Sequence, residues 1–369
     1  VFGLRLYLAY HNGNYTYDAY YDARQISHVK ENFFHIISDP LSYGGRNTVM
    51  LPFFHYILGY LSIIFPLDFV LKVFPNLSAS LIVFILFLIV YEITKDKNAS
   101  LFASFVGGFS PVLFSETISS ISSLSLFVPL SFLYIYSFMR LNDRKFVYLF
   151  VILSFIIPLT SLVSFSLVLA MWIYLIFAKL EHFKFIGRAL EITIFFSFFN
   201  LWIVLILFKN AFVEYGPNII GSTVPSSVRT QYFQDITFGQ LFGGVGVISI
   251  LIGSYVIYQY LFNLKDRYVY LILSFIISLL VLTSLNLVRT AHALTLISIT
   301  LSILVGVYYS NFFRYIRHTS FFNLERFFIV VFVILFTANS LVFALIFSLD
   351  IDVANDSEIR AMEWAEKNT

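Results

Sequence analysis

The sequence predicts an all-α polytopic membrane protein, and three features of the whole chain support that fold class. Of the 369 residues, 59% are hydrophobic and only 12% are charged, and the mean hydropathy is +0.85. A water-soluble surface cannot be built from that composition. The apolar runs are also long and continuous, which favours helices over the alternating strands of a membrane β-barrel. We therefore expect a helical bundle that crosses a bilayer many times.

Apolar runs long enough for a crossing recur along the chain, since a crossing helix needs about 20 residues. The end of one run precedes residue 12, and ten more are centred on 77–94, 99–115, 121–139, 146–158, 160–178, 189–208, 239–262, 268–287, 290–309 and 327–348. We expect a transmembrane domain over residues 1–349 with about eleven helices, the first of them truncated. Because the chain opens inside an apolar helix and stops in a polar helical pattern, we read it as a fragment cut at both ends.

Basic residues identify which connections face the cytoplasm. Thirteen of the 23 Lys and Arg residues lie in five short connections, near residues 95–97, 140–145, 179–188, 265–267 and 314–326. By the positive-inside rule these connections are cytoplasmic. The first external loop, residues 13–76, then lies on the outer side.

One apolar stretch would reverse this topology if it crossed the membrane. Residues 51–65 form a run of about 15 residues that contains His55 and is bracketed by Pro52 and Pro66. A run of that length is short for a crossing. We therefore interpret it as an interfacial or re-entrant helix, so that the first external loop carries amphipathic helices.

Acidic residues on the outer side are the first candidates for chemistry, because a carboxylate near lipid is costly unless it is paired or binds a metal. Asp18 and Asp22 begin an amphipathic helix at residues 17–33, where acids also stabilise a helix N-terminus. Glu116 follows Pro111 in a short outer turn. A capped surface helix and a solvated turn residue are the structural alternatives for these acids.

Two further outer features could bind a ligand. Arg289 joins two helices at the outer interface, and a guanidinium suits phosphate because it donates two parallel hydrogen bonds and stays charged. Snorkelling to lipid headgroups is the alternative. Residues 210–236, with Glu214, Arg229 and Asp235, form either a mobile lid or an ordinary surface loop.

These side chains are consistent with a site for a divalent metal and a pyrophosphate. Hard oxygen ligands select Mg²⁺ or Mn²⁺, and two carboxylates on separate outer loops would supply them. The histidines show no paired ligand spacing, and no nucleotide-binding or serine-hydrolase motif is present. The net charge of +2 gives no reason to expect nucleic acid as a partner.

The run Asp18-Ala-Tyr20-Tyr21-Asp-Ala-Arg24 resembles the D-x-Y-[YF]-x-x-R motif of GT-C membrane glycosyltransferases, in particular the oligosaccharyltransferase catalytic subunit and its archaeal relatives. Residues 39–46 and the interfacial helix are similar to the rest of that family's first external loop. Glu116 falls at the second acidic motif, and Arg289 at the helix-end arginine that contacts the donor phosphate. The tail 358–369 is similar to the run that opens the family's external soluble domain, so residues 350–369 are expected to begin one.

The chain departs from the family pattern at three places. The second motif is Ser115-Glu116-Thr117, with one acid where the family has two. Residues 210–236 contain no clear T-I-x-E or S-V-S-E motif, and the W-W-D-Y-G acceptor motif, if the protein has it, would follow Thr369.

The resemblance implies a GT-C transmembrane bundle and a glycosyltransferase that acts at the extracytoplasmic face of the cell membrane. Its donor would be a sugar or oligosaccharide on polyprenyl (dolichyl) phosphate or pyrophosphate, and its acceptor a protein, lipid or glycan. Asp18 and Glu116 would be catalytic and bind the metal, and Arg289 would bind the donor phosphate. Two other classes stay open, a transporter or flippase for lipid-linked glycans and a structural scaffold.

Overall fold

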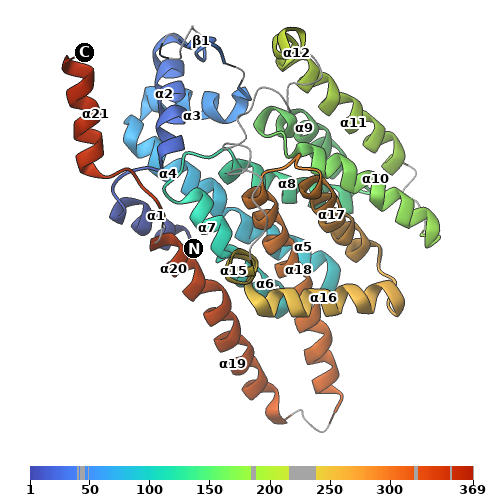
Figure 1. Ribbon diagram of the computed structural model, residues 1–369. Coiled ribbons are helices and arrows are strands. Elements are labelled where there is room, and N and C mark those ends of the chain that lie inside the picture. Colours follow the sequence, from blue (N-terminus) through green and yellow to red (C-terminus); the bar gives the residue numbers. More distant parts are fainter. Residues whose placement is uncertain are drawn as a thin grey trace.

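The computed structural model describes residues 1–39, 41, 46–48, 50–183, 188–215, 238–319, 323–349 and 351–368. Over this range the protein is a bundle of helices (Figure 1). The N-terminal half contains α1 (Phe2–His11), α2 (Tyr17–Asn32), α3 (Pro52–Ile64), α4 (Leu67–Ser80), α5 (Ile82–Thr94), α6 (Lys97–Gly108), α7 (Pro111–Thr117), α8 (Leu124–Met139), α9 (Arg144–Thr160) and α10 (Ser164–Leu180). The remainder contains α11 (Arg188–Leu207), α12 (Lys209–Tyr215), α15 (Phe238–Gln240), η2 (Leu241–Gly246), α16 (Val247–Phe262), α17 (Arg267–Ser284), α18 (Thr290–Arg317), α19 (Glu325–Phe336), η4 (Thr337–Val342), α20 (Phe343–Leu349) and α21 (Asp356–Asn368).

The predicted fold class is confirmed, because a helix occupies each of the ten predicted apolar ranges. Six elements of the described chain are long and apolar enough to cross a membrane, or seven if the bent pair α6 and α7 forms one span. Helices α8, α9 and α10 have 16, 17 and 17 residues, so they reach about 24 to 26 Å at roughly 1.5 Å per residue. That length is below the roughly 30 Å of a bilayer core.

Two details differ from the sequence-based expectation. Residues 67–76, assigned to the external loop, are helical and continue into the next span as one 28-residue element, Leu67–Thr94. Pro75 lies inside this helix, and a proline there disfavours but does not forbid a helix. The first loop also contains a two-residue antiparallel ribbon, β1 (Ser38–Asp39) and β2 (Arg46–Asn47).

Helix α18 is the centre of the bundle. About 78% of its most apolar window is buried inside the protein, against 22% for α11 and for the α19–α20 element. The last two therefore have wide apolar faces available to lipid. Small residues let the central helices approach closely: a Cβ placed on Gly306 of α18 would lie 2.7 Å from the Ala103 Cβ of α6.

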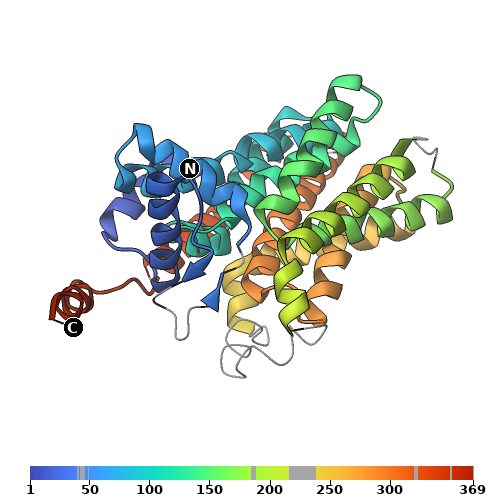
Figure 2. The same ribbon diagram turned by 90° about the horizontal axis from the view of Figure 1, so that it is seen from above.

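The amphipathic helices α2 and α3 form a separate layer at one end of the bundle, upper left in Figure 1. A small apolar core that includes Ala19, Ile26, Phe54 and Leu58 joins them to α4 and α8. We call this the α2 end. Helix α21 stands away from the bundle in both views (Figures 1 and 2).

Two π-helical segments, η2 and η4, meet inside the bundle. Gly246 ends η2 with a φ of 93°, a conformation that side chains other than glycine rarely adopt. The Asn339 amide of η4 fills the adjacent space, donating to the Ser249 hydroxyl at 3.3 Å and accepting from the Ile248 N–H at 3.4 Å. A side chain at position 246 would overlap that amide.

Candidate functional site

Asp18 lies in the first turn of α2 and is exposed. The helix begins after Thr16, whose backbone is extended and whose N–H donates to the Ser119 carbonyl at 3.1 Å. The segment that follows α7 therefore fixes the start of α2. An acid in this turn is favoured by the helix dipole, and its exposed carboxylate is available to a ligand.

Glu116 lies near the end of α7, which begins with Pro111 after a 45° bend from α6. Two asparagines hold the segment that follows it: Asn12 donates to the Ser119 hydroxyl at 2.9 Å, and Asn76 donates to the Ile118 carbonyl at 3.1 Å. The Glu116 side chain is half-buried. It is therefore presented from a short helix that α1, α2 and α4 all fix.

Arg289 is the N-cap residue of α18, on the same side of the bundle as α7. A hydrogen bond of 2.9 Å between the Ser110 and Ser298 hydroxyls joins the start of α7 to α18, two to three turns after Arg289. The Glu116 carboxylate lies within electrostatic range of both the Arg289 guanidinium and the Asp18 carboxylate. Three charges that are distant in sequence are therefore near enough to interact at the α2 end.

Arg5 is a residue that the sequence reasoning did not select. Its side chain is fully buried, its Nη2 donates to the Thr117 hydroxyl, and its guanidinium carbon lies 4.7 Å from the centre of the Phe114 ring. Its Nε and Nη1 have no hydrogen-bond partner in the described structure. The sequence does mark this residue, because an arginine inside an apolar helix is rare and mostly functional. Arg5 therefore contacts Phe114 and Thr117, which lie on either side of Glu116 in α7.

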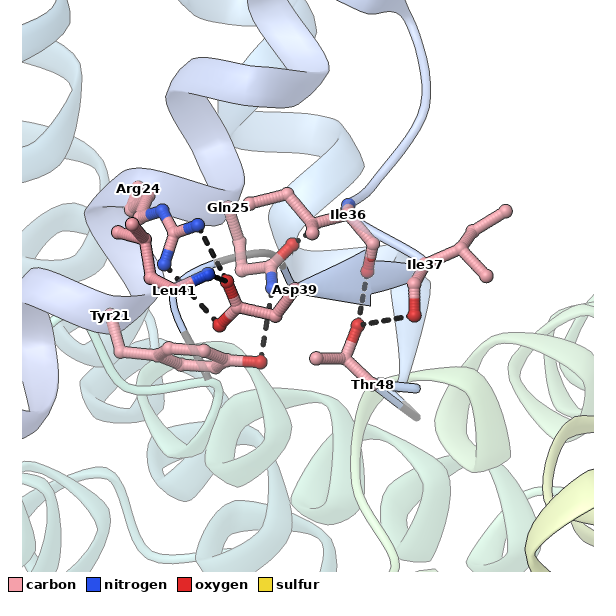
Figure 3. Close-up of polar contacts among 8 residues, drawn as sticks. All are labelled: Tyr21, Arg24, Gln25, Ile36, Ile37, Asp39, Leu41 and Thr48. Atoms are coloured by element: carbon pink, nitrogen blue, oxygen red, sulfur yellow. Dashed lines mark hydrogen bonds and ion pairs between the residues drawn. The ribbon is translucent and has the colours of Figure 1, made fainter. Parts of the chain in front are cut away.

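Other charged residues of the first loop pair with one another and stabilise the loop. Asp22 lies 2.8 Å from the His55 Nε2 of α3, which supports the structural reading of Asp22. Arg24 forms a two-pronged pair with Asp39 on β1, at 2.7 and 3.3 Å (Figure 3). The Arg24 guanidinium and then the Leu41 N–H lower the pKa of the Asp39 carboxyl.

Neutral hydrogen bonds complete this attachment of the β ribbon to α2. Gln25 donates to the Tyr21 hydroxyl at 3.0 Å and accepts from the Ile36 N–H at 3.0 Å (Figure 3). Thr48 donates its N–H to the Ile37 carbonyl at 2.7 Å. Tyr21, Arg24 and Gln25 thus attach the β ribbon to α2, the helix that carries Asp18.

The residues after α20 return to the start of α2. Asn14 donates to the Ala354 carbonyl at 2.9 Å, and the Ala354 N–H donates to the Tyr15 carbonyl at 3.0 Å. Tyr17 donates to the Glu358 carboxylate at 2.7 Å. The Asn355 N–H and then this hydroxyl lower the pKa of Glu358. The polar tail therefore lies next to Asp18.

The expected metal site and the expected lid are only partly covered by the described chain. Across the described ranges, no group of three or more His, Asp or Glu side chains is placed to hold a metal by itself. Of the expected lid, residues 210–215 belong to α12, and residues 216–236, with Arg229 and Asp235, lie outside the described residues. The side chain of Glu214 also lies outside them.

Sequence comparison finds no family model and no curated protein that matches this chain. Solved structures do match. The oligosaccharyltransferase of Archaeoglobus fulgidus in complex with Zn and sulfate superposes with a TM-score of 0.67 at 16% identity, covering 96% of this chain and 52% of that one. The oligosaccharyltransferase AglB from Archaeoglobus fulgidus, in complex with an inhibitory peptide and a dolichol-phosphate, gives a TM-score of 0.69 at 15% identity, over 96% of this chain and 54% of that one.

A bacterial enzyme gives a weaker match to the same architecture. ArnT from Cupriavidus metallidurans bound to undecaprenyl phosphate superposes with a TM-score of 0.53 at 13% identity, covering 78% of this chain and 54% of that one. The chain thus spans just over half the length of these solved structures. At these identities the likeness establishes the fold, which is the GT-C transmembrane bundle predicted from the sequence.

Proposed function

We propose that this protein is a membrane glycosyltransferase that moves a sugar or oligosaccharide from a polyprenyl (dolichyl) phosphate or pyrophosphate donor to an acceptor. The fold supports the general class, because the matched structures are an oligosaccharyltransferase and ArnT, one with dolichol-phosphate and the other with undecaprenyl phosphate. Fold alone does not define function. The side chains at the α2 end therefore decide between the functions that this fold can host.

The observation that carries the proposal is that the charges of Asp18 and Arg289 both act on the Glu116 carboxylate. Charged side chains at the end of a membrane bundle are costly unless they pair with one another or serve a charged ligand, so they mark a functional-site hypothesis. In the proposed roles, Arg289 binds the donor phosphate, and its fork of donors matches phosphate oxygens. Asp18 and Glu116 orient or deprotonate the acceptor nucleophile while the phosphate leaves.

The same two carboxylates fit a divalent metal. They come from separate elements and repel each other, so a cation between them would relieve that repulsion. Mg²⁺ is commonly bound by one or two carboxylates, substrate phosphates and water, and Mn²⁺ accepts the same oxygen ligands, so a cluster of three protein ligands is not required. When bound, the ion would neutralise charge on the leaving phosphate. We propose Asp18 and Glu116 as its ligands, with the sugar-phosphate supplying further oxygens.

The acceptor in this proposal is a protein, a lipid or another glycan, with protein N-glycosylation as the specific case that the oligosaccharyltransferase resemblance favours. AglB has been solved with an inhibitory peptide. In this chain the contacts of residues 354–358 with Asn14 and Tyr17 support placing the start of an external domain, residues 350–369, beside Asp18. An acceptor held by such a domain would be close to the carboxylates.

We place the site on the extracytoplasmic side, because the basic connections lie at the opposite ends of the helices. Cysteines can test this in a chain that has none of its own. Asn47→Cys and Asn355→Cys are expected to react with an impermeant maleimide in intact cells. Asn142→Cys, in the basic connection between α8 and α9, should react only after permeabilisation. Reaction at only one of positions 47 and 355 would contradict the topology.

A transfer assay tests the function itself. The purified protein is incubated with a polyprenyl phosphate or pyrophosphate that carries a radiolabelled sugar, together with an Asn-X-Thr peptide, a lipid or a glycan acceptor. We expect label on one acceptor, loss of transfer with a chelator, and recovery with Mg²⁺ or Mn²⁺. Movement of intact glycolipid across a proteoliposome, with no acceptor labelled, would instead identify a flippase.

A further inference from the structure

A basic cleft of about 570 Å³ lies where the connection between α5 and α6 meets the end of α18. Its lining includes Lys95, Lys97, Arg314, Arg317 and His318. These residues come from two connections more than 200 residues apart in the sequence, and the fold brings them to one place. The cleft is far from Asp18, Glu116 and Arg289, and the proposed reaction does not use it.

Two of the cations that line the cleft are paired with acidic side chains of the protein. Asp96 also lines the cleft, but its carboxylate caps α6 by accepting the Asn98 N–H at 2.9 Å. Lys95 pairs with Glu92 at 2.9 Å, and Arg317 pairs with Glu325 at 2.7 Å.

The cleft has two further cations, Lys97 and Arg314. Both are exposed and form no ion pair within the part of the chain that the structure describes. The cleft therefore offers two cations, Lys97 and Arg314, to an anion, against the one negative charge of Asp96.

The position of the cleft identifies the source of that anion. Helix α18 has 28 residues, about 42 Å at roughly 1.5 Å per residue. That length matches a bilayer with its headgroups, about 40 to 45 Å. Since Arg289 is at one end of α18 and the cleft at the other, the cleft lies at the headgroup level of the opposite leaflet.

Apolar side chains adjoin the cleft on the lipid-facing surface. Leu101 of α6 is 61% exposed, and Tyr315 of α18 is 68% exposed. Both lie within about one helical turn of lining residues, Lys97 and Arg314. A ligand with a phosphate in the cleft could therefore lay an acyl chain along this surface, whereas a free phosphate would contact only the polar lining.

We propose that this cleft binds the phosphate headgroup of an anionic phospholipid of the cytoplasmic leaflet. Arg314 and Lys97 contact the phosphate, and Arg317 and Lys95 remain in their protein ion pairs. Basic pockets between membrane helices on the cytoplasmic side commonly bind such headgroups. The bound lipid would hold the end of the central helix α18 against the connection between α5 and α6.

The test is a titration of the full purified chain with phosphatidylglycerol in detergent, with bound lipids counted by native mass spectrometry and phosphatidylcholine as the neutral comparison. Each basic residue near an anionic lipid contributes roughly a fivefold change in affinity. The double variant Lys97→Gln and Arg314→Gln should therefore bind phosphatidylglycerol roughly 30-fold more weakly. Both residues are exposed, so the melting temperature should be unchanged.

The matched control is the double variant Arg144→Gln and Lys145→Gln. It removes the same charge from another exposed basic connection that does not line the cleft. Equal losses in the two variants would mean general attraction to basic loops and would overturn the proposal. No loss in either would do the same. If inorganic phosphate binds the wild-type chain as tightly as phosphatidylglycerol does, the cleft is a site for soluble phosphate and the lipid assignment is wrong.

Discussion

Replacing Asp18 with asparagine is expected to abolish sugar transfer while the protein stays folded. Asparagine keeps the size of aspartate but removes the charge that would bind a metal or accept a proton. General acid–base groups contribute roughly 10²–10⁴-fold to a rate. The transfer rate should therefore fall at least about 100-fold. The measurement is the initial rate of transfer with the radiolabelled donor.

The matched control for Asp18→Asn is Glu31→Gln, an exposed acid at the other end of α2. Its transfer rate should stay near that of the unmodified protein. Asp18→Asn also removes a charge that repels Glu116, so its melting temperature should not fall. Normal transfer by a folded Asp18→Asn protein would exclude a catalytic role for this residue.

Changing Arg289 to lysine is expected to weaken the use of the donor more than the chemical step. Lysine keeps the charge but replaces a planar two-pronged donor with a single ammonium group. One hydrogen bond to a charged partner is worth about 1.5–3 kcal/mol, which is roughly a 10- to 100-fold rise in KM for the lipid donor. The measurement is a donor titration at saturating acceptor.

Arg326→Lys, in the first turn of α19 near the opposite end of the bundle, is the control for Arg289→Lys and should leave the donor KM unchanged. Glycerophospholipid headgroups are the alternative partner of Arg289. If Arg289→Lys leaves both KM and kcat unchanged, the arginine anchors the helix end at the interface and does not bind the donor.

Much of the fold could be predicted because composition and helix length depend on the bilayer more than on tertiary detail. The prolines at 52 and 66 bracket α3 as predicted. The start of α4 was missed because residues 67–76 are less apolar than the span that they join. The β ribbon was also missed, since its two-residue strands are held by Arg24, Gln25 and Thr48 and carry no alternating pattern.

The candidate site was partly predictable for a related reason. Asp18, Glu116 and Arg289 were found because charge near lipid is rare, so each was visible in isolation. The contacts that position them were not visible. Asn12, Asn76 and Thr16 make ordinary-looking hydrogen bonds to residues 118 and 119, and no local pattern in the sequence marks such partners. Arg5 carries the same signal, because it is a charge inside an apolar helix.

The π-helical segment η4 sets the rotational phase of the helix that precedes the tail. An extra residue in a helical turn rotates everything after it by about 100°. Helix α19 before η4 buries only Phe336, whereas α20 after it turns Ala344 and Ser348 inward, against Leu8 and Phe114 and within reach of Asn12. Residues 351–358 then begin on the side that faces α2. The wide turn of η4 thus rotates α20 relative to α19. This rotation directs the tail that follows α20 toward Asp18.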